Sequence, residues 1–158
     1  MSRSLVLALL LSACSGGDEE DAFDVSSIPS GPLQGVIGGE AWSFGSGITD
    51  SFLSDDSDFF TTFYALDDVG CDDWSVDGGN HLLGSVPTSP GAFAFDLSQN
   101  VTFYIQDTNE NLVATEGGIV VDSVDGGIVR GAMLATYDAD NEVGGSFEVA
   151  ICEDTSTF

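Results

Sequence analysis

The sequence predicts an all-β domain, an antiparallel β-sandwich or alternatively a small β-barrel, built from roughly eight or nine short strands. Three observations predict this class. No long apolar stripe recurs at helical spacing, and Gly, Thr, Val, Phe and Asp stand where helix formers are expected. Apolar residues instead alternate with small or polar ones, which is typical of strands. Clusters of turn residues separate these segments at fairly regular intervals.

The expected strands follow one another with short turns between them. They cover residues 36–37, 42–44, 59–66, 92–97, 101–106, 128–137 and 147–151. The expected turns lie at residues 38–39, 97–100, 107–111, 125–127 and 138–141. The pair Gly38-Gly39 suits a tight hairpin, because such turns need positive φ angles.

The N-terminal segment 1–14 has the pattern of an export signal. Arg3 supplies a positive charge, residues 5–11 are all apolar, and small residues precede a cysteine. The apolar run is too short for a transmembrane helix, which needs about 20 residues. The sequence Leu11-Ser12-Ala13-Cys14 resembles the lipobox of bacterial lipoproteins.

This resemblance implies that the signal peptide, residues 1–13, is removed and that Cys14 carries diacylglycerol with palmitate-type chains. Two or three acyl chains would anchor the protein stably to a membrane. Ser15 in the next position resembles lipoproteins sent to the outer membrane, and the acidic run 18–21 resembles a surface-export signal. The alternative is an ordinary secretory signal cut after Ala13, which leaves Cys14 as a free thiol.

The rest of the chain divides into a tether and one domain. Residues 14–32 are rich in Gly, Ser, Pro and acidic residues and lack the apolar density for folding alone. Residues 33–158 are expected to form the single all-β domain. The opening Gly35-Val36-Ile37-Gly38-Gly39-Glu40-Ala41-Trp42 and the close Gly145-Ser146-Phe147 with Cys152 loosely resemble small envelope lipoproteins. That resemblance implies a β domain and no activity.

The charge of the chain limits its partners. Lys and Arg together number 2 against 27 Asp and Glu, which gives a formal net charge of −25. Such a chain is not expected to bind nucleic acid, whose phosphates need Lys and Arg, and the polypeptide is not attracted to anionic membranes. The expected partners are therefore the membrane, through the N-terminal lipid, and an unknown protein or glycan. The acidity itself has three interpretations: a solvated surface, adaptation to salt, or calcium binding.

Two cysteines remain after Cys14, namely Cys71 and Cys152. An even pair in an exported protein predicts one disulfide. The bridge would close a loop of roughly 80 residues and fasten an acidic loop to the end of the last strand. Because Cys152 shares strand parity with Glu148 and Ala150, we expect it to lie off the core face.

Calcium is a possible cofactor because hard cations prefer clustered carboxylates. The segment Asp138-Ala139-Asp140-Asn141 begins like an EF-hand loop, but the later positions fail and a hairpin turn explains it better. Denser clusters flank the 59–66 strand and could share an ion if their loops lie on one rim. Their residues are Asp55, Asp56 and Asp58 on one side and Asp67, Asp68, Asp72 and Asp73 on the other.

No catalytic motif is found in the sequence. His81 is the single histidine, has turn-like neighbours, and is expected at a loop or strand end. No Gly-x-Ser-x-Gly segment is present, and one histidine argues against a zinc site. Acidic pairs of the kind a glycosidase needs are inevitable among so many carboxylates, and short turns leave little room for a cleft.

Arg130 and two tryptophans complete the candidate residues. Arg130 is expected to pair with carboxylates, with anion binding as the alternative. Trp42 is assigned to the core, whereas Trp74 lies in an acidic segment and is a candidate exposed ligand contact. The function expected is a lipid-anchored, non-enzymatic protein of the cell envelope with a structural or binding role. A calcium-stabilised adhesion or carbohydrate-binding module is the alternative, and a small hydrolase is third.

Overall fold

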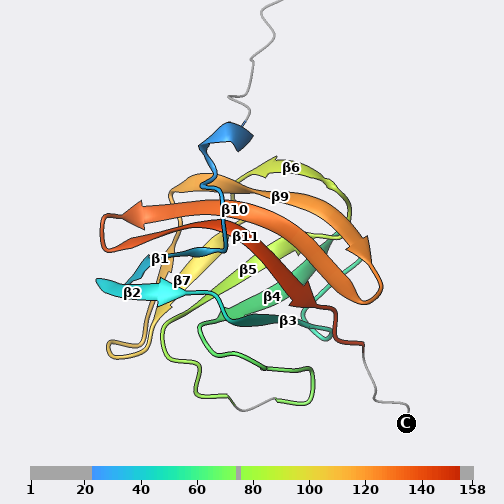
Figure 1. Ribbon diagram of the computed structural model, residues 1–158, viewed down its shortest axis with the longest axis horizontal. Coiled ribbons are helices and arrows are strands. Elements are labelled where there is room, and N and C mark those ends of the chain that lie inside the picture. The colour runs from blue at the N-terminus through green and yellow to red at the C-terminus, as the bar shows by residue number, and fades with distance from the viewer. Residues whose placement is uncertain (1–22, 74–75, 154–158) are drawn as a thin grey trace, which may run out of the picture.

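The computed structural model describes residues 23–73 and 76–153, which form an all-β domain (Figure 1). A short 3-10 turn, η1 (Val25–Ser27), precedes the strands, and no helix in the described part is long and apolar enough to cross a membrane. The strands are β1 (Gln34–Ile37), β2 (Glu40–Ser43), β3 (Ser46–Asp50), β4 (Asp58–Tyr64), β5 (His81–Pro87), β6 (Gly91–Ala94), β7 (Val101–Ile105), β8 (Glu110–Val113), β9 (Glu116–Asp125), β10 (Ile128–Asp138) and β11 (Asn141–Ala150).

Nine of the strands form one continuous curled sheet in the order β6-β9-β10-β11-β3-β4-β5-β7-β8. The sheet bends round into a half-barrel (Figure 1). Neighbours along it are antiparallel except β11 and β3, which pair in parallel through Ala150 and Ile48. The β1–β2 hairpin branches from the edge of β11. The predicted all-β class is confirmed, and the curled sheet is consistent with the sandwich or barrel that was expected.

The core fills the inside of the curled sheet. Phe63 of β4 is fully buried and makes edge-on contacts with Phe44 and Phe147, with ring centroids 6.0 and 5.2 Å apart. Trp42 is buried, as expected, with 5% of its surface exposed. Strands from both halves of the sheet therefore meet in one hydrophobic cluster.

The expected hairpins are present, but the number of strands was underestimated. Gly38 and Gly39 have φ angles of 64° and 77°, and the 138–141 turn joins β10 to β11. The prediction missed β3, β5, β8 and β9. In β9 the register shifts opposite Arg130 and Gly131, so an extra residue interrupts the alternation on which the prediction depended.

The strand expected at residues 92–97 extends too far toward the C-terminus. β6 ends at Ala94, and Leu97 is fully exposed. The carboxylate of Asp96 accepts hydrogen bonds from the backbone N–H groups of Ser98 and Gln99, each 2.7 Å long. This Asx turn ends the strand, because it ties the backbone to a side chain instead of to a neighbouring strand.

The C-terminal end of the expected tether packs on the domain. The Gly31 carbonyl accepts hydrogen bonds from the N–H of Ser146 at 2.8 Å and from its hydroxyl at 2.9 Å. Leu33 is fully buried, and its N–H donates to the Ser146 carbonyl. Residues 29–33, here called the strap, cover the edge of β11 between its contacts with β1 and β3. The expected boundary at residue 33 therefore lies inside the packed part of the chain.

Candidate functional site

A groove of about 660 Å³ opens at one end of the domain. Its lining comes from β2, the segment between β4 and β5, and the turn after β7. In Figure 1 these elements lie on the side of the domain away from η1. Its lining residues are Ile37, Gly38, Glu40, Ala41, Trp42, Ala65, Leu66, Asp77, Gly78, Gly79, Asn80, Ile105, Gln106, Asp107 and Thr108. Short turns were expected to leave little room for a cleft, but the β4–β5 connection is long and contributes one wall of this groove.

Asn80 joins three walls of this groove. Its side-chain Nδ2 donates to the Ile37 carbonyl at 2.9 Å, and its Oδ1 accepts from the N–H of Gln106 at 3.0 Å. Its backbone carbonyl accepts a 2.9 Å hydrogen bond from Nε1 of Trp42. These bonds fix the positions of the β1–β2 hairpin, the start of β5 and the end of β7 relative to one another. The sequence prediction missed Asn80, because no local pattern distinguishes it from other turn asparagines.

The groove combines an apolar floor with an acidic rim. The exposed apolar residues, here called the floor, are Ala41, Ala65 and Leu66, and Ile37, Trp42 and Ile105 are buried beneath them. The side chains of Glu40, Asp77 and Asp107 are exposed and form the rim. Asp77 accepts a 2.6 Å hydrogen bond from Nε2 of Gln106. No side chain or N–H group in the described part of the chain donates to the carboxylates of Glu40 or Asp107.

His81 lies at the first position of β5, as expected, outside the groove lining. Its ring packs between Tyr64 and Tyr104 from the neighbouring strands, with centroid distances of 5.8 and 4.6 Å. Its Nδ1 donates to the Gly79 carbonyl at 2.8 Å. Burial lowers the pKa of His81 from 6.5, and the bond to Gly79 opposes this shift.

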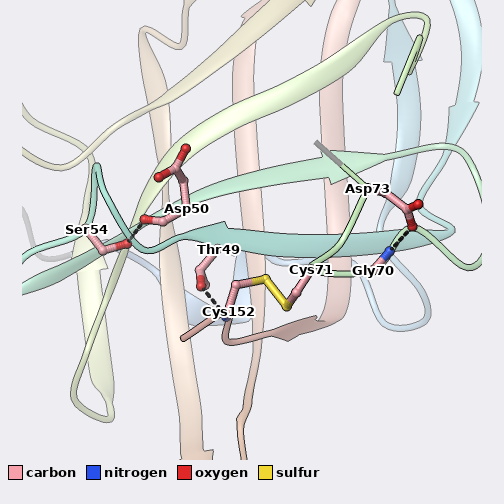
Figure 2. The surroundings of a disulfide bond; sticks show 7 residues. All are labelled: Thr49, Asp50, Ser54, Gly70, Cys71, Asp73 and Cys152. Carbon is pink, nitrogen blue, oxygen red and sulfur yellow. Dashed lines mark hydrogen bonds between the residues drawn. A yellow bond between two sulfur atoms is a disulfide. The ribbon is translucent and has the colours of Figure 1, made fainter. Parts of the chain in front are cut away.

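The structure contains the expected disulfide between Cys71 and Cys152, with their Cα atoms 5.4 Å apart (Figure 2). It attaches the loop after β4 to the chain leaving β11, as predicted. Cys152 exposes only 5% of its surface, but it is not among the residues of the hydrophobic core cluster, so the expectation that it lies off the core face is not contradicted. Its N–H donates a 2.9 Å hydrogen bond to Oγ1 of Thr49.

The two acidic loops lie at opposite ends of β4. Asp55, Asp56 and Asp58 are at its start, and Asp67, Asp68, Asp72 and Asp73 follow its end. Within the first loop Asp55 accepts hydrogen bonds from the hydroxyl of Ser57 and from the N–H groups of Ser57 and Asp58, and these bonds lower its pKa. Within the second loop Asp73 accepts a 2.8 Å bond from the N–H of Gly70 (Figure 2). Among residues 23–73 and 76–153, no group of three or more His, Cys, Asp or Glu side chains is arranged to hold a metal ion.

Arg130 pairs with carboxylates on its own sheet. Its guanidinium lies 3.4 Å from Asp125 and 3.5 Å from Glu148, and all three side chains are partly exposed. The structural pairing expected for Arg130 is therefore present. Two further candidates, Cys14 and Trp74, lie outside the described residues.

No family model, curated protein or solved structure matches this chain. The function is therefore inferred from the residues of this chain and their arrangement.

Proposed function

We propose that this protein is an exported lipoprotein of the bacterial cell envelope whose β domain is a non-enzymatic binding module. The sequence Leu11-Ser12-Ala13-Cys14, placed directly after an apolar run, carries the proposal. The Cys71–Cys152 disulfide supports it, because disulfides persist in oxidising compartments outside the cytoplasm. Acyl chains on Cys14 would hold the protein at the outer membrane.

The position of the groove supports a binding role for the anchored domain. The chain from Cys14 to Phe23 spans at most about 30 Å when fully extended, so the domain would stay close to the membrane. The described chain begins beside η1, and the elements whose residues line the groove lie on the other side of the domain from η1 (Figure 1). An anchored domain in this orientation would present the groove to molecules outside the membrane.

Lipidation is tested by expressing the full chain in a diderm bacterium with a clickable palmitate analogue. We expect label on the wild-type protein and partition into detergent, and neither for Cys14→Ala. The double variant Cys71→Ala with Cys152→Ala is the matched control, since it removes the other two cysteines and should keep the label. An unlabelled wild-type protein that fractionates with soluble periplasmic proteins would refute the anchor.

A further inference from the structure

We propose that the groove binds an aliphatic diamine or polyamine, whose ammonium groups would contact the acidic rim while its methylene chain covers the apolar floor. This inference rests on the proposed binding function and assigns its ligand class. It depends on three properties of the groove: the placement of charge, the size and polarity of the floor, and the rigidity of the walls.

The negative charge of the groove favours a cationic ligand. Glu40 is on β2, Asp77 precedes β5 and Asp107 follows β7, so carboxylates approach the groove from three different elements. Only Asp77 has a hydrogen-bond donor in the described part of the chain, the amide of Gln106. Arg130, the only strong cation after the signal segment, does not line the groove. A bound ammonium group would form charge-assisted hydrogen bonds there, whereas an anion would be repelled.

The apolar floor favours a ligand whose charged groups are joined by a methylene chain. The apolar surface that a ligand could contact comes from Ala41, Ala65 and Leu66, and Leu66 exposes 41% of its surface. A volume of about 660 Å³ is within the range of small-molecule sites, roughly 300–1,000 Å³. A diamine carries a charge at each end and methylene groups between, so it matches separated carboxylates above an apolar floor.

The walls are already held in place without a ligand. The three hydrogen bonds of Asn80 join the hairpin, β5 and β7, and the disulfide fastens the β4–β5 connection to the end of β11. A groove that is organised before binding does not spend interaction energy on ordering loops. Gly78 is buried against the ring of Tyr64, which further fixes the wall that carries Asp77.

The test is calorimetric titration of the full chain carrying Cys14→Ala at physiological salt. The probes are 1,5-diaminopentane and spermidine, with pentane-1,5-diol as the neutral analogue and tetralysine as a basic peptide. The groove variant is Glu40→Gln with Asp107→Asn. The matched control is Glu116→Gln with Asp122→Asn, which removes the same charge from exposed positions on β9 outside the groove.

We expect both amines to bind and the diol not to bind. The groove variant should weaken amine binding by about tenfold or more, since two charge-assisted contacts are lost, and the β9 control should change it less than about twofold. Equal weakening in both variants would show diffuse attraction to a −25 chain and overturn the site. Three results would overturn the ligand class: the diol binds, tetralysine binds but the two amines do not, or neither amine binds. The lipidation result is independent of all these outcomes.

Discussion

The indole nitrogen of Trp42 donates a 2.9 Å hydrogen bond to the carbonyl oxygen of Asn80. These residues are 38 positions apart in the chain, and the bond connects β2 to the start of β5. The Asn80 side chain adds bonds to Ile37 and Gln106. One asparagine thus holds together the groove proposed as the binding site.

Replacing Asn80 by alanine should lower the free energy of unfolding by about 1–2 kcal/mol. The partly buried carbonyl of Ile37 and the more exposed N–H of Gln106 would both lose their side-chain partner. The control Asn111→Ala changes an exposed residue of β8 and should cost less than about 0.5 kcal/mol. Urea unfolding measures both variants, and an equal loss in the two would show that Asn80 does not act as described.

The disulfide should stabilise the domain substantially. Its cysteines are separated by 81 residues in sequence, and a loop of that length corresponds to roughly 4 kcal/mol in the chain-entropy model. We expect a reductant to lower the melting temperature of the wild-type protein. The double variant Cys71→Ser with Cys152→Ser should melt at a similar low temperature and be insensitive to the reductant. A wild-type melting temperature unchanged after complete reduction would contradict this account.

The packing of the strap against β11 should require glycine at position 145. Gly145 has a φ of 133°, and a Cβ built there would lie 2.5 Å from the Pro32 carbonyl oxygen. Gly145→Ala should therefore displace the strap and speed hydrogen exchange at the N–H groups of Leu33 and Ser146. Gly126→Ala is the control, because Gly126 also has a positive φ, 58°, but its Cβ would meet no atom within 4 Å. Unchanged exchange in Gly145→Ala would show that the strap tolerates the side chain.

Stability should fall as the pH is lowered through the titration of His81. Burial lowers the pKa of His81 in the folded state below its ordinary value of 6.5. The unfolded chain therefore binds the proton first, so the stability present above pH 6.5 is lost as the pH falls toward the folded-state pKa. The single imidazole signal in NMR spectra should titrate below 6.5, and His81→Gln should abolish this part of the pH dependence. Titration at or above the ordinary value would contradict the prediction.

The 27 acidic residues should make the thermal stability of the domain depend on the concentration of any salt. Screening reduces repulsion within a chain of net charge −25, so sodium chloride should raise the melting temperature. The loops containing Asp55 and Asp67 lie at opposite ends of β4, which argues against one ion shared between them. The measurement is the melting temperature with EDTA, with millimolar calcium and over a range of sodium chloride concentrations. A calcium-specific rise at low concentration would instead support the calcium-stabilised module.

Local sequence patterns were sufficient to predict part of the fold. The Gly38-Gly39 pair and the 138–141 segment predicted their hairpins, because turn geometry depends on a few adjacent residues. They were insufficient for β9, where a bulge opposite Arg130 breaks the alternation. The strap was assigned to the tether because its residues are typical of linkers. It is nevertheless packed, since Gly144 and Gly145 leave space for Pro29 and Pro32.

The sequence by itself determined the all-β class, the hairpin turns, the cysteine pair and the expectation of a lipid anchor. These follow from composition, alternation and short motifs. Only the tertiary structure decided that the strap belongs to the domain, that Cys152 is buried, and that Glu40, Asp77 and Asp107 line one groove. The physical reason is the range of the contacts. The partners of Asn80 lie 26 to 43 residues away along the chain, and pairing between distant segments leaves no periodic signal in the sequence.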